Sequence, residues 1–66
     1  MATEIYNVIG NRDQVESMLA LCPCKMTDKF QTDDEDMFDI NVSVEDEDCD
    51  ELVEFCEDNG LECELV

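Results

Sequence analysis

The sequence predicts an α+β domain in which four strands form an antiparallel sheet and two helices cover one of its faces. Three observations support this prediction. Several short segments alternate apolar and polar residues, which is typical of strands with one buried face. Two other segments carry apolar residues at positions i, i+3, i+4 and i+7, which is typical of helices. The chain has 66 residues, which allows one domain, residues 1–66, with a small core.

A strand followed by a helix is predicted for residues 4–9 and 11–22. The first segment is rich in β-branched and aromatic residues and ends at Gly10, as strands often do. Asn11 can cap a helix, and Gln14 three positions later completes a capping-box pattern. One helical face then carries Val15, Met18, Leu19 and Cys22, and Pro23 is expected to stop the helix.

The middle of the chain predicts a hairpin. Residues 25–32 alternate weakly, so we expect an edge strand in which Met26 and Phe30 face inward while the lysines face water. The acidic run Asp33-Asp34-Glu35-Asp36 forms the predicted turn. The clearest strand follows, because polar residues separate the apolar residues Phe38, Ile40, Val42 and Val44.

A second helix and a last strand complete the chain. Asp46 or Asp48 is placed to cap the helix, and Asp48 with Glu51 fits a capping box. The apolar stripe of this helix consists of Cys49, Leu52, Val53 and Cys56, and Asn59-Gly60 is a typical helix end. Glutamates then alternate with Leu61, Cys63 and Leu65, which predicts a strand.

The predicted element order is therefore β-α-β-β-α-β. Two βαβ halves joined by a hairpin form the ferredoxin-like arrangement, and right-handed crossovers place both helices on one face of the sheet. Core-facing positions then hold Cys22, Cys49, Cys56 and Cys63. We expect free thiols that pack as small apolar side chains, as in a reducing cytosol. Cys24 falls outside the helical stripe, so we expect it to be exposed.

The charge of the chain is extreme and uneven. Twenty acids and three bases, without histidine, give a net charge of −17. Residues 1–32 hold four acids and all three bases, whereas residues 33–66 hold sixteen acids and no base. Such a field repels nucleic acid and anionic membranes and attracts basic proteins. We therefore expect a partner with a basic surface and no direct binding to nucleic acid or membrane.

The acids are predicted to form clusters on the turn, on the outer side of the second helix and on the open sheet face. The expected partner-binding residues are Asp33, Asp34, Glu35, Asp36, Glu47, Asp50, Glu51, Glu54, Glu57 and Asp58. The open face would carry Asp39, Glu45, Glu62 and Glu64. Such carboxylates recur at roughly 6.6 Å on a strand and about 5–6 Å on a helix, the scale of neighbouring phosphates in nucleic acid. Rows of them can occupy lysine and arginine sites that bind phosphate.

A calcium site of the EF-hand type is disfavoured. Asp46, Asp48 and Asp50 with Glu57 at the twelfth position match that loop superficially. The sixth position, however, holds Glu51 in place of the glycine that makes the sharp turn. We therefore predict no specific calcium site.

Cysteine chemistry and catalysis are disfavoured as well. Cys22-Pro23-Cys24 is not the C-x-x-C spacing of thioredoxins or zinc knuckles. A four-cysteine zinc site drawn from distant segments remains an alternative. The chain has no histidine, no nucleophile motif and no glycine-rich phosphate loop, so we expect neither enzymatic activity nor a cofactor.

In size and composition the chain resembles the small acidic proteins of phages and mobile elements, which include DNA mimics and anti-CRISPR proteins. The resemblance is carried by the length of the chain, by Asp33 to Asp36 and by Glu45 to Asp58, and no shared motif supports it. It implies an inhibitor that occupies the DNA-binding surface of a CRISPR effector complex. It also implies that the protein is located in the cytoplasm of a host cell.

The main alternative is a generic interaction module or small dimer that uses its open sheet face. Ile5, Asn7 and Ile9 would lie on that face, opposite Tyr6 and Val8, and would form a small apolar patch. A mimic, by contrast, is expected to be a monomer. No apolar run approaches the roughly 18 residues of a membrane helix, which favours a cytoplasmic protein.

Overall fold

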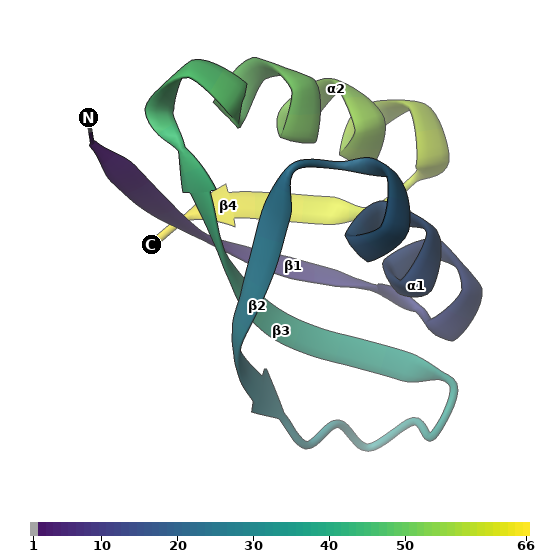
Figure 1. Cartoon of the computed structure of the whole chain (residues 1–66). Coiled ribbons are helices and arrows are strands. Elements are labelled where there is room, and N and C mark those ends of the chain that lie inside the picture. Colours follow the sequence, from purple (N-terminus) through teal and green to yellow (C-terminus); the bar gives the residue numbers. More distant parts are fainter. Residues whose placement is uncertain (1) are drawn as a thin grey trace.

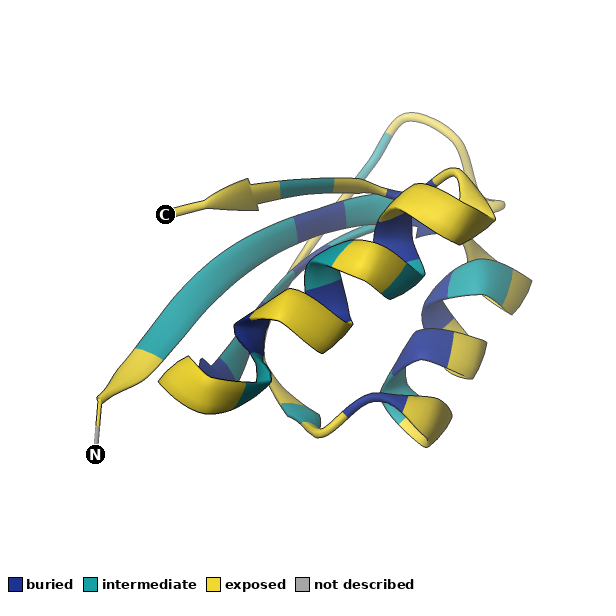
Figure 2. Ribbon diagram, turned by 90° about the horizontal axis from the view of Figure 1, so that it is seen from above, coloured by how far each residue is buried: buried dark blue, intermediate teal, exposed yellow. Residues whose placement is uncertain are grey.

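The computed structural model describes residues 2–66 and contains the predicted elements in the predicted order (Figure 1). The elements are β1 (Thr3–Asn11), α1 (Arg12–Leu21), β2 (Cys24–Phe30), β3 (Met37–Glu45), the 3-10 helix η1 (Asp46–Asp48), α2 (Cys49–Asn59) and β4 (Glu62–Leu65). The strands form one sheet in the order β2-β3-β1-β4, with every neighbouring pair antiparallel. Both helices lie on the same face of the sheet (Figure 2). The predicted α+β class is confirmed.

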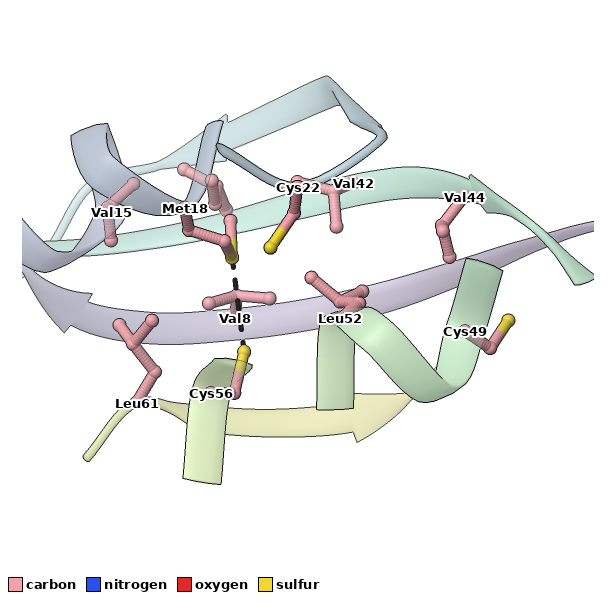
Figure 3. Packing of buried hydrophobic residues seen from close by; sticks show 11 residues of the cluster. Val8, Val15, Met18, Cys22, Val42, Val44, Cys49, Leu52, Cys56 and Leu61 are labelled. Carbon is pink, nitrogen blue, oxygen red and sulfur yellow. Dashed lines mark hydrogen bonds between the residues drawn. The ribbon is translucent and has the colours of Figure 1, made fainter. Parts of the chain in front are cut away.

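The core lies between this sheet face and the two helices. Val8 of β1 stands opposite Ile40 of β3 on one side and Cys63 of β4 on the other. The buried apolar residues are Val8, Val15, Met18, Cys22, Ile40, Val42, Val44, Cys49, Leu52, Cys56 and Leu61 (Figure 3). Within this cluster the Cys56 thiol donates to Met18 Sδ at 3.9 Å. The helices are therefore joined through soft, polarizable side chains.

The capping box of α1 is confirmed. The Gln14 backbone N–H donates to Asn11 Oδ1 at 2.8 Å, and the Asn11 N–H donates to Gln14 Oε1 at 3.0 Å. The helix ends at Leu21, two residues before Pro23. The Gln14 side-chain amide also donates to the Asn59 carbonyl, so the same residue connects the start of α1 to the end of α2.

The predicted capping box at the start of α2 is wrong. Asp48 is the residue before the helix, but its side chain makes no capping hydrogen bond. Asp48 belongs to η1, and its backbone has φ −102° and ψ −2°. A capping residue normally has an extended backbone, and the 3-10 turn gives Asp48 a helical backbone instead. The predicted helix end is confirmed, because Gly60 adopts the left-handed conformation with φ 74°.

Strand β2 lies at the sheet edge as predicted. The predicted direction of its side chains is wrong beyond Met26. A bulge shifts the register between Met26 and Asp28. Lys29 then stands opposite Ile40 on the helix side, with its Nζ 4.6 Å from the centre of the Phe38 ring. Phe30 stands opposite Asp39, on the open face, and is 45% exposed. One extra residue in a strand reverses the direction of every later side chain.

All five cysteines are free thiols. The prediction that four of them face the core is confirmed. Cys22, Cys49 and Cys56 are buried, and Cys63 packs against the core. Cys24 was expected to be exposed, but it is half-buried and also packs against the core. Its place at the start of β2, opposite Val44, explains this burial.

Gly10 is required by close packing rather than by backbone conformation. A Cβ at this position would overlap the Leu61 side chain, which crosses directly over Gly10. We expect Gly10→Ala to lower the free energy of unfolding by about 1–3 kcal/mol in urea denaturation, as overpacking does. Gly60→Ala is the comparison, since it tests only the left-handed backbone. It should lower the free energy of unfolding by about 1 kcal/mol. An unchanged urea midpoint for Gly10→Ala would contradict the packing of Leu61.

The buried thiols predict a loss of stability at alkaline pH. Burial raises the pKa of Cys24 to about 11 and that of Cys56 to about 12, from an ordinary 9.0. The unfolded chain therefore loses these protons at lower pH than the folded chain does. Their contribution to stability is complete below about pH 8 and is lost as the pH rises towards about 11–12.

Urea denaturation at several values between about pH 8 and pH 11 measures this loss. The double variant with Cys24→Ala and Cys56→Ala should show a shallower dependence on pH. Val15→Ala is the matched control, because it also removes buried apolar volume but keeps both thiols. Equal slopes in all three proteins would refute the role of the thiols.

Candidate acidic interface

The exposed acids of helix α2 and the preceding η1 form a negative surface. Burial of Cys49, Leu52 and Cys56 against the sheet orients the helix and leaves its other side in solvent. That outer side is yellow in Figure 2. The helix-two cluster consists of the exposed residues Glu47, Asp50, Glu51, Glu54, Glu57 and Asp58, with Glu47 contributed by η1. The structure thus brings together six of the ten predicted partner-binding residues.

Glu54 lies at the centre of the helix-two cluster. It has carboxylates three or four positions away in both directions along the helix, namely Asp50, Glu51, Glu57 and Asp58. Residues at these spacings are neighbours on a helix surface, and each like-charged pair costs about 0.2–0.5 kcal/mol. The helix therefore carries a repulsion of about 1–2 kcal/mol that a partner's cations would relieve.

The last turn of α2 adds a second unfavourable arrangement. Acids in the first turn, Asp50 and Glu51, suit the positive end of the helix dipole. Glu57 and Asp58 lie near the negative end, where the helix has no basic residue. The charge pattern of α2 therefore destabilises the isolated helix and favours the binding of an external cation.

The turn cluster, Asp33 to Asp36, is ordered by its own hydrogen bonds. The Asp36 N–H donates to Asp34 Oδ1 at 3.0 Å, and the Met37 N–H donates to the Asp34 carbonyl at 3.1 Å. The Thr32 hydroxyl donates to the carbonyl of Met37 at 2.9 Å. All four acids of the turn are exposed. This loop therefore presents its carboxylates to solvent on a defined backbone.

The two clusters lie on different parts of the molecule. Figure 1 shows the loop between β2 and β3 well separated from α2. The turn cluster also adjoins bases: Arg12 lines a shallow depression with Asp36, and Lys29 lines another with Asp34 and Glu35. The sequence analysis assigned the two clusters to different elements. The structure likewise places them on a helix surface and on a turn at the end of the sheet.

The three bases lie on α1 and β2, and none lies on the elements that carry the helix-two cluster. Within residues 2–66 the single salt bridge joins Arg12 Nε to Glu16 Oε1 at 3.2 Å, along α1. Lys25 and Lys29 belong to β2, whereas β4 lies at the opposite edge of the sheet. No ion pair to a described base therefore neutralises the acids of α2.

The open sheet face combines acids with a half-buried apolar pair. Asn7 is its polar centre, since its Nδ2 donates to Asp39 Oδ1 at 2.6 Å and to Asn41 Oδ1 at 3.1 Å. Ile5 and Ile9 flank Asn7 on the same face, as predicted, and both are half-buried. The exposed side chains of Glu62 and Glu64 border this face on β4.

Two features of the open face were not predicted. Phe30 joins it because of the bulge in β2, and no residue pattern in the sequence marks that bulge. The Asn7–Asp39 hydrogen bond depends on the pairing of β1 with β3, which brings together residues 32 positions apart. Glu45 stands opposite Thr3 and is exposed, as expected.

The described residues contain no group of three or more cysteine, aspartate or glutamate side chains arranged to hold a metal ion. No helix within residues 2–66 has the length and apolar character needed to cross a membrane. Comparison of the chain with protein-family models, with curated proteins and with solved structures found no match. The surfaces of the molecule are therefore the features from which a function can be inferred.

The position of Glu54 predicts a gain in stability when its charge is removed. Glu54→Gln should raise the free energy of unfolding by about 0.5–1.5 kcal/mol, because several like-charged pairs lose one partner. Asp28→Asn is the matched control, since it also removes one exposed negative charge but lies on β2 near the lysines. Urea denaturation at low salt measures both. Destabilisation by Glu54→Gln would contradict the proposed crowding of charge.

Proposed function

We propose that the protein is an inhibitor that binds the basic nucleic-acid-binding surface of another protein and excludes nucleic acid from it. The observation that carries the proposal is the helix-two cluster. It places five exposed carboxylates along α2 and a sixth in the preceding η1, and none of them forms an ion pair with a base among the described residues. A solvated surface kept only for solubility normally mixes both signs of charge.

The proposed mechanism is direct competition for cations. The carboxylates of α2 are about 5–6 Å apart at Cβ for neighbours three or four positions apart, close to the scale of phosphates along a strand. Lysine and arginine side chains in a partner's groove can therefore pair with Glu54 and its neighbours in place of phosphates. Association would be fast and strongly dependent on salt, since the whole field of the molecule steers a basic partner towards it.

The narrower proposal is an anti-CRISPR protein that blocks target-DNA binding by a Cas effector complex. It rests on the resemblance in size and acidity to inhibitors of phages and mobile elements. Such a complex has a channel lined by lysine and arginine that holds nucleic acid by its backbone. In this setting the protein would act as a monomer in the cytoplasm of the host cell.

The second candidate is an interaction module that uses the open sheet face. Ile5, Ile9 and Phe30 make this face partly apolar, and the Asn7–Asp39 hydrogen bond fixes one carboxylate within it. A dimer through this face would appear as a mass that rises with concentration in light scattering. The charge of −17 on each copy opposes such self-association and favours a basic partner.

Reversal of charge in the helix-two cluster tests the proposed function. The wild-type protein and a double variant with Asp50→Lys and Glu54→Lys are immobilised, exposed to host lysate and eluted with a salt gradient. We expect the wild-type protein to retain DNA-binding proteins. Moderate salt and added duplex DNA should each release them. The variant should bind these proteins about tenfold more weakly or worse, because close charge pairs across an interface are lost and replaced by repulsion.

The matched control is a double variant with Asp13→Lys and Asp28→Lys, which changes the net charge by the same amount on α1 and β2. It should bind nearly as wild type does. Equal loss in both variants would refute a localised surface. A retained partner that duplex DNA cannot displace would favour the open-face module, and the absence of any specific partner would contradict both candidates.

A further inference from the structure

The two edges of the sheet differ in how they are protected. Strand β2 forms one edge and carries Lys25, Lys29 and the bulge between Met26 and Asp28. Lysines and bulges are the usual features that prevent an edge from pairing with another chain. Strand β4 forms the other edge and pairs in regular register with β1, without a bulge, a proline or a lysine. Only β4 is therefore suited to accept another strand.

The register shows which backbone groups of β4 face outward. The Val66 N–H donates to the Ile5 carbonyl at 2.9 Å, and Glu64 and Glu62 continue this pairing opposite Asn7 and Ile9. Alternate residues of an antiparallel strand direct their backbone groups to opposite sides. The N–H and C=O groups of Cys63 and Leu65 are thus directed to the free edge.

The side chains beside this edge define what could pair with it. Glu62 and Glu64 are exposed on the open face, on one side of the strand. Leu65 stands opposite Tyr6 on the helix side and is 60% exposed. An added strand would therefore meet two carboxylates on one of its faces and an uncovered leucine on the other.

We propose that β4 binds an extended segment of a basic protein partner by strand addition. The segment would alternate lysine or arginine, facing Glu62 and Glu64, with apolar residues, facing Leu65. Backbone hydrogen bonds would provide affinity and the alternating side chains specificity. This inference goes beyond competition with nucleic acid, because it assigns binding to backbone groups and holds whether or not DNA displaces the partner.

The probe is a synthetic seven-residue peptide that alternates arginine and valine, titrated into isotopically labelled protein at physiological salt. The amide signals of Cys63 and Leu65 should shift, whereas those of β2 should not. A second peptide of the same sequence carries N-methyl groups on alternate residues, which removes the backbone donors but keeps the charge. It should bind about tenfold more weakly or worse.

Two variants of the protein itself test the same edge. Leu65→Pro removes one outward N–H and leaves the pairing with β1 intact, since proline is tolerated on edge strands. Leu65→Ala removes the side chain but keeps the N–H. We expect the first variant to lose binding about tenfold and the second about threefold or less. Equal binding of the two peptides, equal effects of the two variants, or no shift at Cys63 and Leu65 would overturn the proposal.

Discussion

The burial of eleven apolar side chains between one sheet face and two helices is the constraint on which the rest of the structure depends. The chain is short, so this cluster must offset both the conformational entropy of folding and the repulsion among twenty acids. All five cysteines contribute to this core, since Cys22, Cys49 and Cys56 belong to the cluster and Cys24 and Cys63 pack against it. Because the core uses only one side of α2, that helix can present carboxylates on its other side without loss of packing.

The same constraint explains why the elements could be predicted from the sequence. Alternation in β3 and the apolar stripes of both helices follow directly from which side chains enter the core. The capping box of α1 was also visible, since it depends on two residues three positions apart. Local patterns of this kind need no knowledge of distant neighbours.

The errors arose where local patterns compete or where pairing decides the outcome. Asp48 and Glu51 match a capping box, but a 3-10 turn, Asp46–Asp48, includes Asp48 and changes its backbone. The facing of Phe30 depends on a bulge that only the pairing with β3 reveals. For the candidate interface the sequence assigned the acids to a turn and to a helix, but it did not show how these two surfaces lie relative to each other, because that depends on how the hairpin and α2 are placed in space.

The position of the lysines has a practical consequence for any experiment that attaches the molecule to a surface. Both lysines lie on β2, and this strand forms the sheet edge farthest in strand order from β4. Coupling through lysine amines would therefore tether the protein by β2 and orient β4 towards solution. The uneven distribution of bases, which separates Lys25 and Lys29 from the acids of α2, thus also supplies a natural chemical handle for oriented display.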